Sequence, residues 1–185
     1  MKTKLFLFTL TAFIFSHMQT EAQKTSKRQK VLVVYFSYTG NTRELAKQIH
    51  EQVGGDMVEL ELVTPYSKDY KTVEKQGQDE VHAGYKPPLK TKINSIQTYD
   101  VIFIGSPIWW FTIAPPISTF LSQYDLSGKQ IIPFITHGGY GLGRSINDIK
   151  KLSPKSTLLK GYEVEGNQVK TTKEKMKQWL KTLKL

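Results

Sequence analysis

A segment rich in hydroxyl groups, Ser37-Tyr38-Thr39-Gly40-Asn41-Thr42, stands directly after a continuous apolar run. If a helix begins here, its first backbone N–H groups have no partner within the helix, and the helix dipole favours a negative charge beside them. Hydroxyl side chains add further donors, so the segment predicts a phosphate-binding loop. It contains no lysine, which makes a Walker-type triphosphate loop a poor fit. A plain helix cap with a turn is the alternative, since Thr, Gly and Asn also favour those roles.

A second segment, Ser106-Pro107-Ile108-Trp109-Trp110, follows an apolar run that ends at Gly105. Large aromatic side chains in such a position pack either in the core or against a flat ligand. Side chains alternate in direction along extended backbone, so the two tryptophan rings cannot point to the same side there. We expect one of them, Trp109 in preference, to face a ligand crevice and the other to pack against the following helix.

A third segment, Thr136-His137-Gly138-Gly139-Tyr140-Gly141, also follows an apolar run. Its glycines let the backbone adopt positive φ and approach a ring system closely, and Tyr140 could stack on such a ring. His137 is a proton carrier, a substrate contact or a polar loop residue hydrogen-bonded to backbone, and we favour the last interpretation. The glycines lack the strict Gly-x-Gly-x-x-Gly order, so they match a dinucleotide-binding loop only weakly.

The three segments share one position in the predicted secondary structure, because each follows a strand. Strands are predicted over 31–36, 57–62, 101–105, 131–136 and 157–164, and helices over 41–53, 68–82, 143–152 and 172–183 and after 115–116. Strands that alternate with helices imply right-handed crossovers and a parallel sheet covered on both faces. The fold class is therefore α/β, a three-layer open doubly wound sheet of five parallel strands, whose ligand crevice lies at the carboxyl edge.

The first segment, with Tyr35-Phe36 before it, resembles the phosphate loop of the flavodoxins, which reads Ser/Thr-x-Thr-Gly-x-Thr after the first strand. The resemblance extends in order and spacing over most of residues 31–164 and is to the short-chain type. It implies the strand order 2-1-3-4-5, with FMN at the switch between strands one and three. It also implies that 106–110 flank the isoalloxazine ring and that 136–141 line its other side and pyrimidine edge.

The resemblance implies a function in electron transfer, with FMN performing the redox chemistry and the protein tuning it. An FMN-dependent NAD(P)H:quinone or small-molecule reductase is the alternative on the same fold. A flavin-free binding module is a second alternative, against which the intact phosphate loop argues. The expected partners are redox proteins, and the oligomeric state is open.

Composition excludes several other classes of function. The chain of 185 residues has no cysteine, so structural disulfides, thiolate zinc sites, iron–sulfur clusters and cysteine nucleophiles are ruled out. Its four histidines match no metal-ligand spacing. The formal net charge is +10, but the basic residues are spread out and form no arginine-rich block, so nucleic acid is not an expected partner. An acidic redox partner fits this charge better.

The first residues have the character of a secretory leader. Lys2 and Lys4 precede the apolar run 5–15, and small or polar residues lead to Ala22. The apolar run is too short to span a bilayer comfortably. We expect 1–22 to be a signal peptide, 23–30 a linker and 31–185 an FMN-binding domain. The mature protein would then be exported, in the periplasm, and without stable membrane insertion.

Overall fold

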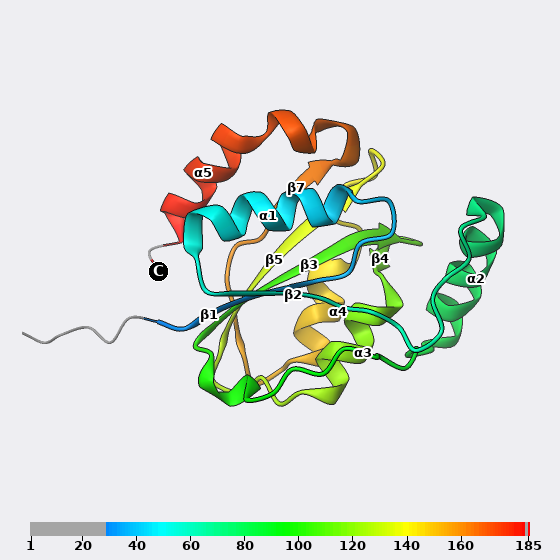
Figure 1. Ribbon diagram of the computed structural model, residues 1–185, viewed down its shortest axis with the longest axis horizontal. Coiled ribbons are helices and arrows are strands. Elements are labelled where there is room, and N and C mark those ends of the chain that lie inside the picture. Colours follow the sequence, from blue (N-terminus) through cyan, green and yellow to red (C-terminus); the bar gives the residue numbers. More distant parts are fainter. Residues whose placement is uncertain (1–28, 184) are drawn as a thin grey trace, which may run out of the picture.

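The central feature of the molecule is one twisted sheet, seen nearly edge-on in Figure 1. The computed structural model describes residues 29–183 and 185, so the predicted signal peptide and most of the linker lie outside the described residues. The main strands are β1 (Val31–Tyr35), β2 (Asp56–Glu59), β3 (Val101–Trp109), β5 (Gln130–His137) and β6 (Thr157–Leu158). They pair in parallel in the order β2-β1-β3-β5-β6, which confirms the predicted order 2-1-3-4-5.

Two further strands extend this sheet. β4 (Thr112–Ile113) folds back antiparallel on the end of β3, and β7 (Tyr162–Glu165) continues the pairing of β5 beyond β6. The single strand predicted over 157–164 is thus two pieces. The break faces Pro133, which has no N–H to donate, and a Cβ on Gly161 would come within 2.9 Å of the Pro133 carbonyl oxygen. The proline is therefore tolerated inside the sheet because its neighbouring strand is interrupted opposite it.

Helices cover both faces of the sheet. They are α1 (Asn41–Val53), α2 (Tyr70–Ala83), α3 (Pro115–Gln123), α4 (Ser145–Leu152) and α5 (Lys173–Thr182), with 3-10 turns η1 (Ile96–Thr98) and η2 (Gly166–Thr171). α1 and α5 pack on one face, and α3 and α4 pack on the other. The three layers of the prediction are confirmed. Within the described residues, no helix is both long and apolar enough to cross a membrane.

α2 stands apart from these layers. Figure 1 shows it beyond the carboxyl edge of the sheet, past the ends of β1 and β3. Its N-terminus is capped by Asp69, whose side chain accepts a hydrogen bond from the Thr72 backbone N–H at 2.8 Å. The crossover between β2 and β3 therefore places a helix over the edge where ligands bind in such sheets.

Candidate functional site

The three predicted segments meet at the carboxyl edge of the sheet. Residues 37–42 lead from β1 into α1, and Pro107 of β3 pairs in register with Thr136 of β5. The Oγ1 atoms of Thr42 and Thr136 lie 2.8 Å apart, within a buried hydrogen bond. The first and third segments are thus joined directly, and the second lies between them.

The N-terminus of α1 has the geometry of an anion site. Gly40 precedes the helix with φ 94° and offers no side-chain cap. The Arg43 backbone N–H donates to Ser37 Oγ at 3.2 Å, so Ser37 keeps its own O–H as a donor. In the pair of Thr42 and Thr136, one hydroxyl donates to the other, and the second O–H stays free to donate. Thr39 is exposed, which leaves it accessible to a ligand.

The basic residue that follows this loop, Arg43, is already paired with a carboxylate. Arg43 binds Glu59 through two hydrogen bonds, Nε to Oε2 at 2.8 Å and a terminal nitrogen to Oε1 at 2.5 Å. Tyr35 also donates to Glu59, at 3.1 Å. Burial, followed by the charge of Glu59, raises the pKa of Tyr35 to about 12. An anion bound at this loop would therefore be held by backbone N–H groups and hydroxyl groups rather than by an ion pair.

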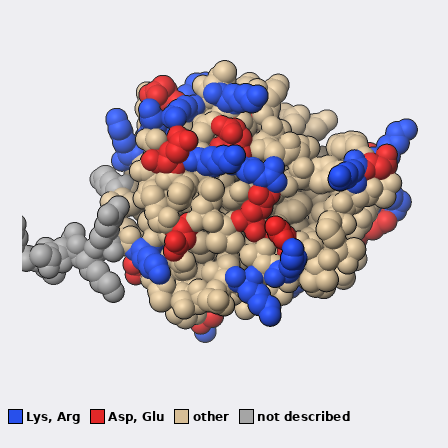
Figure 2. Space-filling view, in the orientation of Figure 1, with Lys and Arg blue, Asp and Glu red and all other residues tan. Residues whose placement is uncertain are grey.

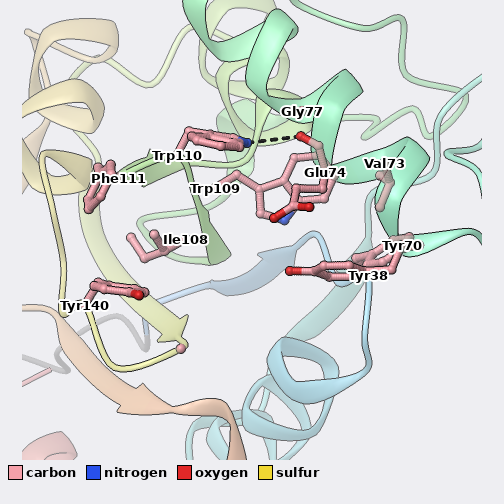
Figure 3. Close-up of a pocket in the computed structure, with 11 residues that line it drawn as sticks. Tyr38, Tyr70, Val73, Glu74, Gly77, Ile108, Trp109, Trp110, Phe111 and Tyr140 are labelled. Atoms are coloured by element: carbon pink, nitrogen blue, oxygen red, sulfur yellow. Dashed lines mark hydrogen bonds between the residues drawn. The ribbon is translucent and has the colours of Figure 1, made fainter.

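A cavity of about 410 Å³ adjoins the loop, within the usual range for small-molecule sites. Its lining residues come from the phosphate loop, α2, the end of β3 with its turn to β4, and the glycine loop: Tyr38, Tyr70, Val73, Glu74, Gly77, Ile108, Trp109, Trp110, Phe111, Gly138 and Tyr140 (Figure 3). Tyr38 belongs both to the phosphate loop and to this lining. An aromatic cavity and an anion site are therefore continuous.

The turn between β3 and β4 is unusual, because two bulky residues occupy left-handed backbone. Trp110 has φ 47° and Phe111 has φ 64°, whereas such two-residue hairpin turns favour Asn-Gly. A Cβ on Gly143 would come within 2.2 Å of the Phe111 carbonyl oxygen, and the Arg144 backbone N–H donates to that oxygen at 2.8 Å. Close contact with the following loop thus holds the turn in a strained form, as occurs at functional sites.

Both tryptophans line the cavity, because the turn takes Trp110 out of the extended backbone that the sequence analysis assumed. Trp109 packs edgewise against Phe36 and lies 4.9 Å from the Tyr66 ring, centroid to centroid. Trp110 donates from Nε1 to the Glu74 carbonyl oxygen at 3.2 Å. These contacts come from the β1 end, the loop before α2 and α2 itself, and Trp109 also packs against the core cluster that includes Ile117 of the following helix, α3.

The structure also shows the surroundings of other residues in the second and third predicted segments. Ser106 is fully buried, and its Oγ donates to the Pro107 carbonyl oxygen and accepts from the Ala114 backbone N–H. His137 accepts a hydrogen bond from the Gly139 backbone N–H, which agrees with the interpretation we favoured. Gly139 and Gly141 have positive φ, as the glycine-rich loop required. Tyr140 is 75% exposed, with its ring centroid 6.0 Å from that of Phe111.

Sequence reasoning missed one wall of the cavity. This wall is formed by α2, which was predicted only as a lysine- and glutamine-rich helix. The lining residues that it contributes are Tyr70, Val73, Glu74 and Gly77. The signal that could have found this wall is Gly77, a glycine inside a helix. A Cβ there would lie 2.9 Å from Trp109 Cε3, so the absence of a side chain at Gly77 makes room for the Trp109 indole. Within the described part of the chain, no group of acidic and histidine side chains could hold a metal ion.

Comparisons with known proteins agree with this architecture. The sequence profile of the flavodoxin family matches residues 30–183. A chain assigned as a flavoprotein from Bacteroides eggerthii is 32% identical, with a TM-score of 0.71 over 85% of this chain and 99% of that one. A second, from Bacteroides uniformis, is 31% identical, with a TM-score of 0.70 over 82% and 99%.

A third structure shares the fold at lower identity. It is a flavoprotein from Lactobacillus acidophilus in complex with FMN, 22% identical, with a TM-score of 0.66 over 77% of this chain and 97% of that one. No curated protein matches the chain. The family profile covers almost the whole of the described residues, and the protein therefore belongs to the flavodoxin family.

Proposed function

We propose that this protein binds FMN non-covalently and carries electrons on it. The observation that carries the proposal is the continuity of the anion site with the aromatic cavity through Tyr38. A flavin mononucleotide has one phosphate and one large flat ring, so it needs these two features side by side. The FMN complex of the Lactobacillus acidophilus flavoprotein, on the same fold, gives further support.

The donor set at the α1 N-terminus fits a phosphate. The first backbone N–H groups of the helix, Ser37 Oγ and the exposed Thr39 hydroxyl would hold its oxygens, and the helix dipole would stabilise its charge. The aromatic lining would bury the ring and exclude water from it. When bound, the flavin would supply reversible one- and two-electron chemistry.

The experiment is reconstitution of the full chain with FMN and, separately, riboflavin. We expect FMN to bind with a shifted visible absorption spectrum and quenched fluorescence, because the ring enters an aromatic cavity. Riboflavin should bind more weakly, since it lacks the phosphate. A protein that leaves both spectra unchanged would instead be the flavin-free binding module.

An FMN-dependent reductase is the second candidate, and the open mouth of the cavity favours it. Phe111 and Tyr140 at this mouth are 57% and 75% exposed, so a small molecule could reach the site. Rapid turnover of NAD(P)H with a quinone would distinguish the reductase from a carrier. A carrier would exchange electrons with a partner protein and turn over NAD(P)H slowly.

The charge of the chain bears on the partner. We propose an exported protein with an acidic redox partner, on the basis of its leader-like N-terminus and net charge of +10. Figure 2 shows lysine and arginine spread over one face among acidic residues rather than gathered in a patch. If the net positive charge attracts an acidic partner, electron transfer should slow as ionic strength rises, since screening acts over about 8 Å at physiological salt. A flat salt dependence would argue against an acidic partner.

A further inference from the structure

The mouth of the cavity is formed by two aromatic rings from different segments. Phe111 comes from the β3–β4 turn and Tyr140 from the glycine loop, and their ring centroids lie 6.0 Å apart. Figure 3 shows both rings at the same end of the cavity. They are 57% and 75% exposed, so burial alone does not hold either ring. The distance between the rings therefore depends on how the turn is held against the segment that leads from β5 into α4.

A small hydrogen-bond network joins these two segments. Thr112, the residue after Phe111, is 5% exposed, and its hydroxyl donates to Asp148 Oδ2 at 2.6 Å. Arg144 Nε donates to the same oxygen at 3.0 Å, and the Arg144 backbone N–H donates to the Phe111 carbonyl oxygen at 2.8 Å. One carboxylate thus contacts both the end of the turn and the residue whose backbone binds the turn. We call Thr112, Arg144 and Asp148 the turn latch.

Asp148 can act on the flavin site only through its partners. It lies in the first turn of α4, where the helix dipole favours a negative charge. It does not line the cavity beside the phosphate loop but a separate one of about 200 Å³. The bond from Thr112 is the stronger part of the latch, because this hydroxyl is buried and would be costly to leave without an acceptor. The ion pair with Arg144 is partly exposed and contributes little.

We propose that Asp148 is a positioning residue for the flavin ring. Through Thr112 it holds the β3–β4 turn against the start of α4, and it thereby sets the gap between Phe111 and Tyr140. The latch does not touch the phosphate site, which is built from the β1–α1 loop and Thr136. A ligand with the ring alone should therefore sense the latch as strongly as a ligand with ring and phosphate. The effect on the ring rests on the proposed function, whereas the hold on the turn does not.

The first measurement uses the full chain without ligand. Hydrogen exchange of the Arg144 backbone N–H, followed by NMR, reports how often its bond to Phe111 opens. We expect exchange about tenfold faster in Asp148→Ala, because Thr112 then has no acceptor and the turn loses a buried anchor. Asp148→Asn keeps an oxygen acceptor for Thr112, so it should restore most of the protection. Unchanged exchange in Asp148→Ala would overturn the inference.

The second measurement titrates FMN and riboflavin into the same variants. Asp148→Ala and Thr112→Val should each weaken both flavins by the same factor, about fivefold, because both variants break one bond. The double variant should therefore bind the flavins no more weakly than either single variant. Asp148→Asn should bind them almost as tightly as the unaltered chain. A loss confined to FMN, or additive losses in the double variant, would contradict the positioning role.

Asp125→Ala is the matched control, because Asp125 also accepts from one hydroxyl and one N–H. Its carboxylate binds Ser127 Oγ at 2.5 Å and the Ser127 backbone N–H at 3.0 Å, in the loop before β5 and so at the other edge of the sheet. This variant should change neither Arg144 exchange nor flavin affinity. Effects equal to those of Asp148→Ala would overturn the inference, since they would reflect a general loss of stability. If the unaltered chain bound neither flavin, the proposed function and the effect on the ring would fail together, while the exchange rates would decide whether Asp148 holds the turn.

Discussion

Thr42 and Thr136 are 94 residues apart in the chain, and their Oγ1 atoms lie 2.8 Å from each other. Both side chains are almost fully buried, at 1% and 3% exposure. The bond joins the start of α1 to the end of β5, so it sets the distance between the phosphate loop and the glycine loop. A buried hydroxyl left without its partner is costly, which makes the pair sensitive to substitution on either side.

The first prediction concerns this pair and the phosphate. Thr42→Val keeps the shape of the side chain and removes its hydroxyl, so FMN affinity should fall more than riboflavin affinity. A hydrogen bond to a charged group contributes about 1.5–3 kcal/mol, equivalent to roughly tenfold or more in the FMN dissociation constant. Titration of both ligands by flavin fluorescence measures the difference. Equal losses for the two ligands would assign Thr42 to the fold rather than to phosphate binding.

The second prediction concerns Gly77. Gly77→Ala would bring a Cβ within 2.9 Å of Trp109 Cε3, and that ring is already packed against Phe36 and Tyr66. Overpacking costs about 1–3 kcal/mol, which outweighs or offsets the roughly 1 kcal/mol that alanine gains over glycine in a helix. We expect no net stabilisation, a changed tryptophan fluorescence spectrum and weaker FMN binding. Lys75→Ala, on the exposed side of α2, is the control and should change neither signal.

The third prediction concerns the strained turn. Phe111→Gly and Phe111→Ala remove the same ring, but only glycine adopts φ 64° without strain. The glycine variant should therefore have the larger free energy of unfolding, by about 1 kcal/mol, which reverses the usual order of the two residues. Urea denaturation of the two variants measures this difference. If alanine were the more stable, the backbone at Phe111 would not be left-handed in solution.

The fourth prediction is a loss of stability at alkaline pH. Burial, followed by a carboxylate partner, raises the pKa of Tyr35 and of Tyr99 to about 12 in each case. Their ordinary pKa is near 10, so between pH 10 and 12 the unfolded chain releases protons that the folded chain retains. The free energy of unfolding should then fall by about 1.4 kcal/mol per pH unit for each group. Below pH 10 these two groups should contribute no slope.

Denaturant unfolding at a series of pH values measures this slope. Tyr99 donates a hydrogen bond to Asp56 at 2.7 Å, so Tyr99→Phe should flatten the slope by the share of one group. Tyr85→Phe is the control, because Tyr85 is 50% exposed. An unchanged slope in Tyr99→Phe would mean that this hydroxyl titrates alike in the folded and unfolded chains.

The fifth prediction concerns export. Cleavage after Ala22 leaves Gln23 as the first residue and removes Lys2, Lys4 and Glu21, which lowers the net charge from +10 to +9. The intact mass of protein recovered from the native host should therefore correspond to residues 23–185. Full-length protein found in the cytosol would contradict both the signal peptide and the periplasmic location.

Local chemistry explains which elements were predictable. Leu45, Ile49 and Val53 recur at helical spacing and glycines follow them, so the predicted helix 41–53 agrees with α1. The phosphate loop could also be predicted from local sequence, because its hydroxyl residues and its glycine are adjacent in the chain. β2 is shorter than predicted, because Leu62 leaves the parallel ladder and pairs with Leu89.

Long-range packing explains what was missed. Nothing near Gly77 in the sequence indicates an indole, because Trp109 reaches it from a strand 32 positions later. The turn at Trp110 and Phe111 contradicts local propensity, since bulky residues avoid positive φ. Contacts of Gly143 and Arg144 with Phe111, and the hydrogen bond from Trp110 to Glu74, hold this conformation. The cavity wall and its mouth are thus products of tertiary structure.

The break opposite Pro133 also bears on how the protein behaves at high concentration. An outer strand with a long row of unpaired backbone groups invites pairing with another chain and leads to aggregation. Here that edge is divided into β6, of two residues, and β7, of four, with Gly161 between them. A neighbouring molecule meets no straight run long enough to add a strand. The interrupted edge should therefore disfavour the addition of a strand from another molecule on this side of the sheet.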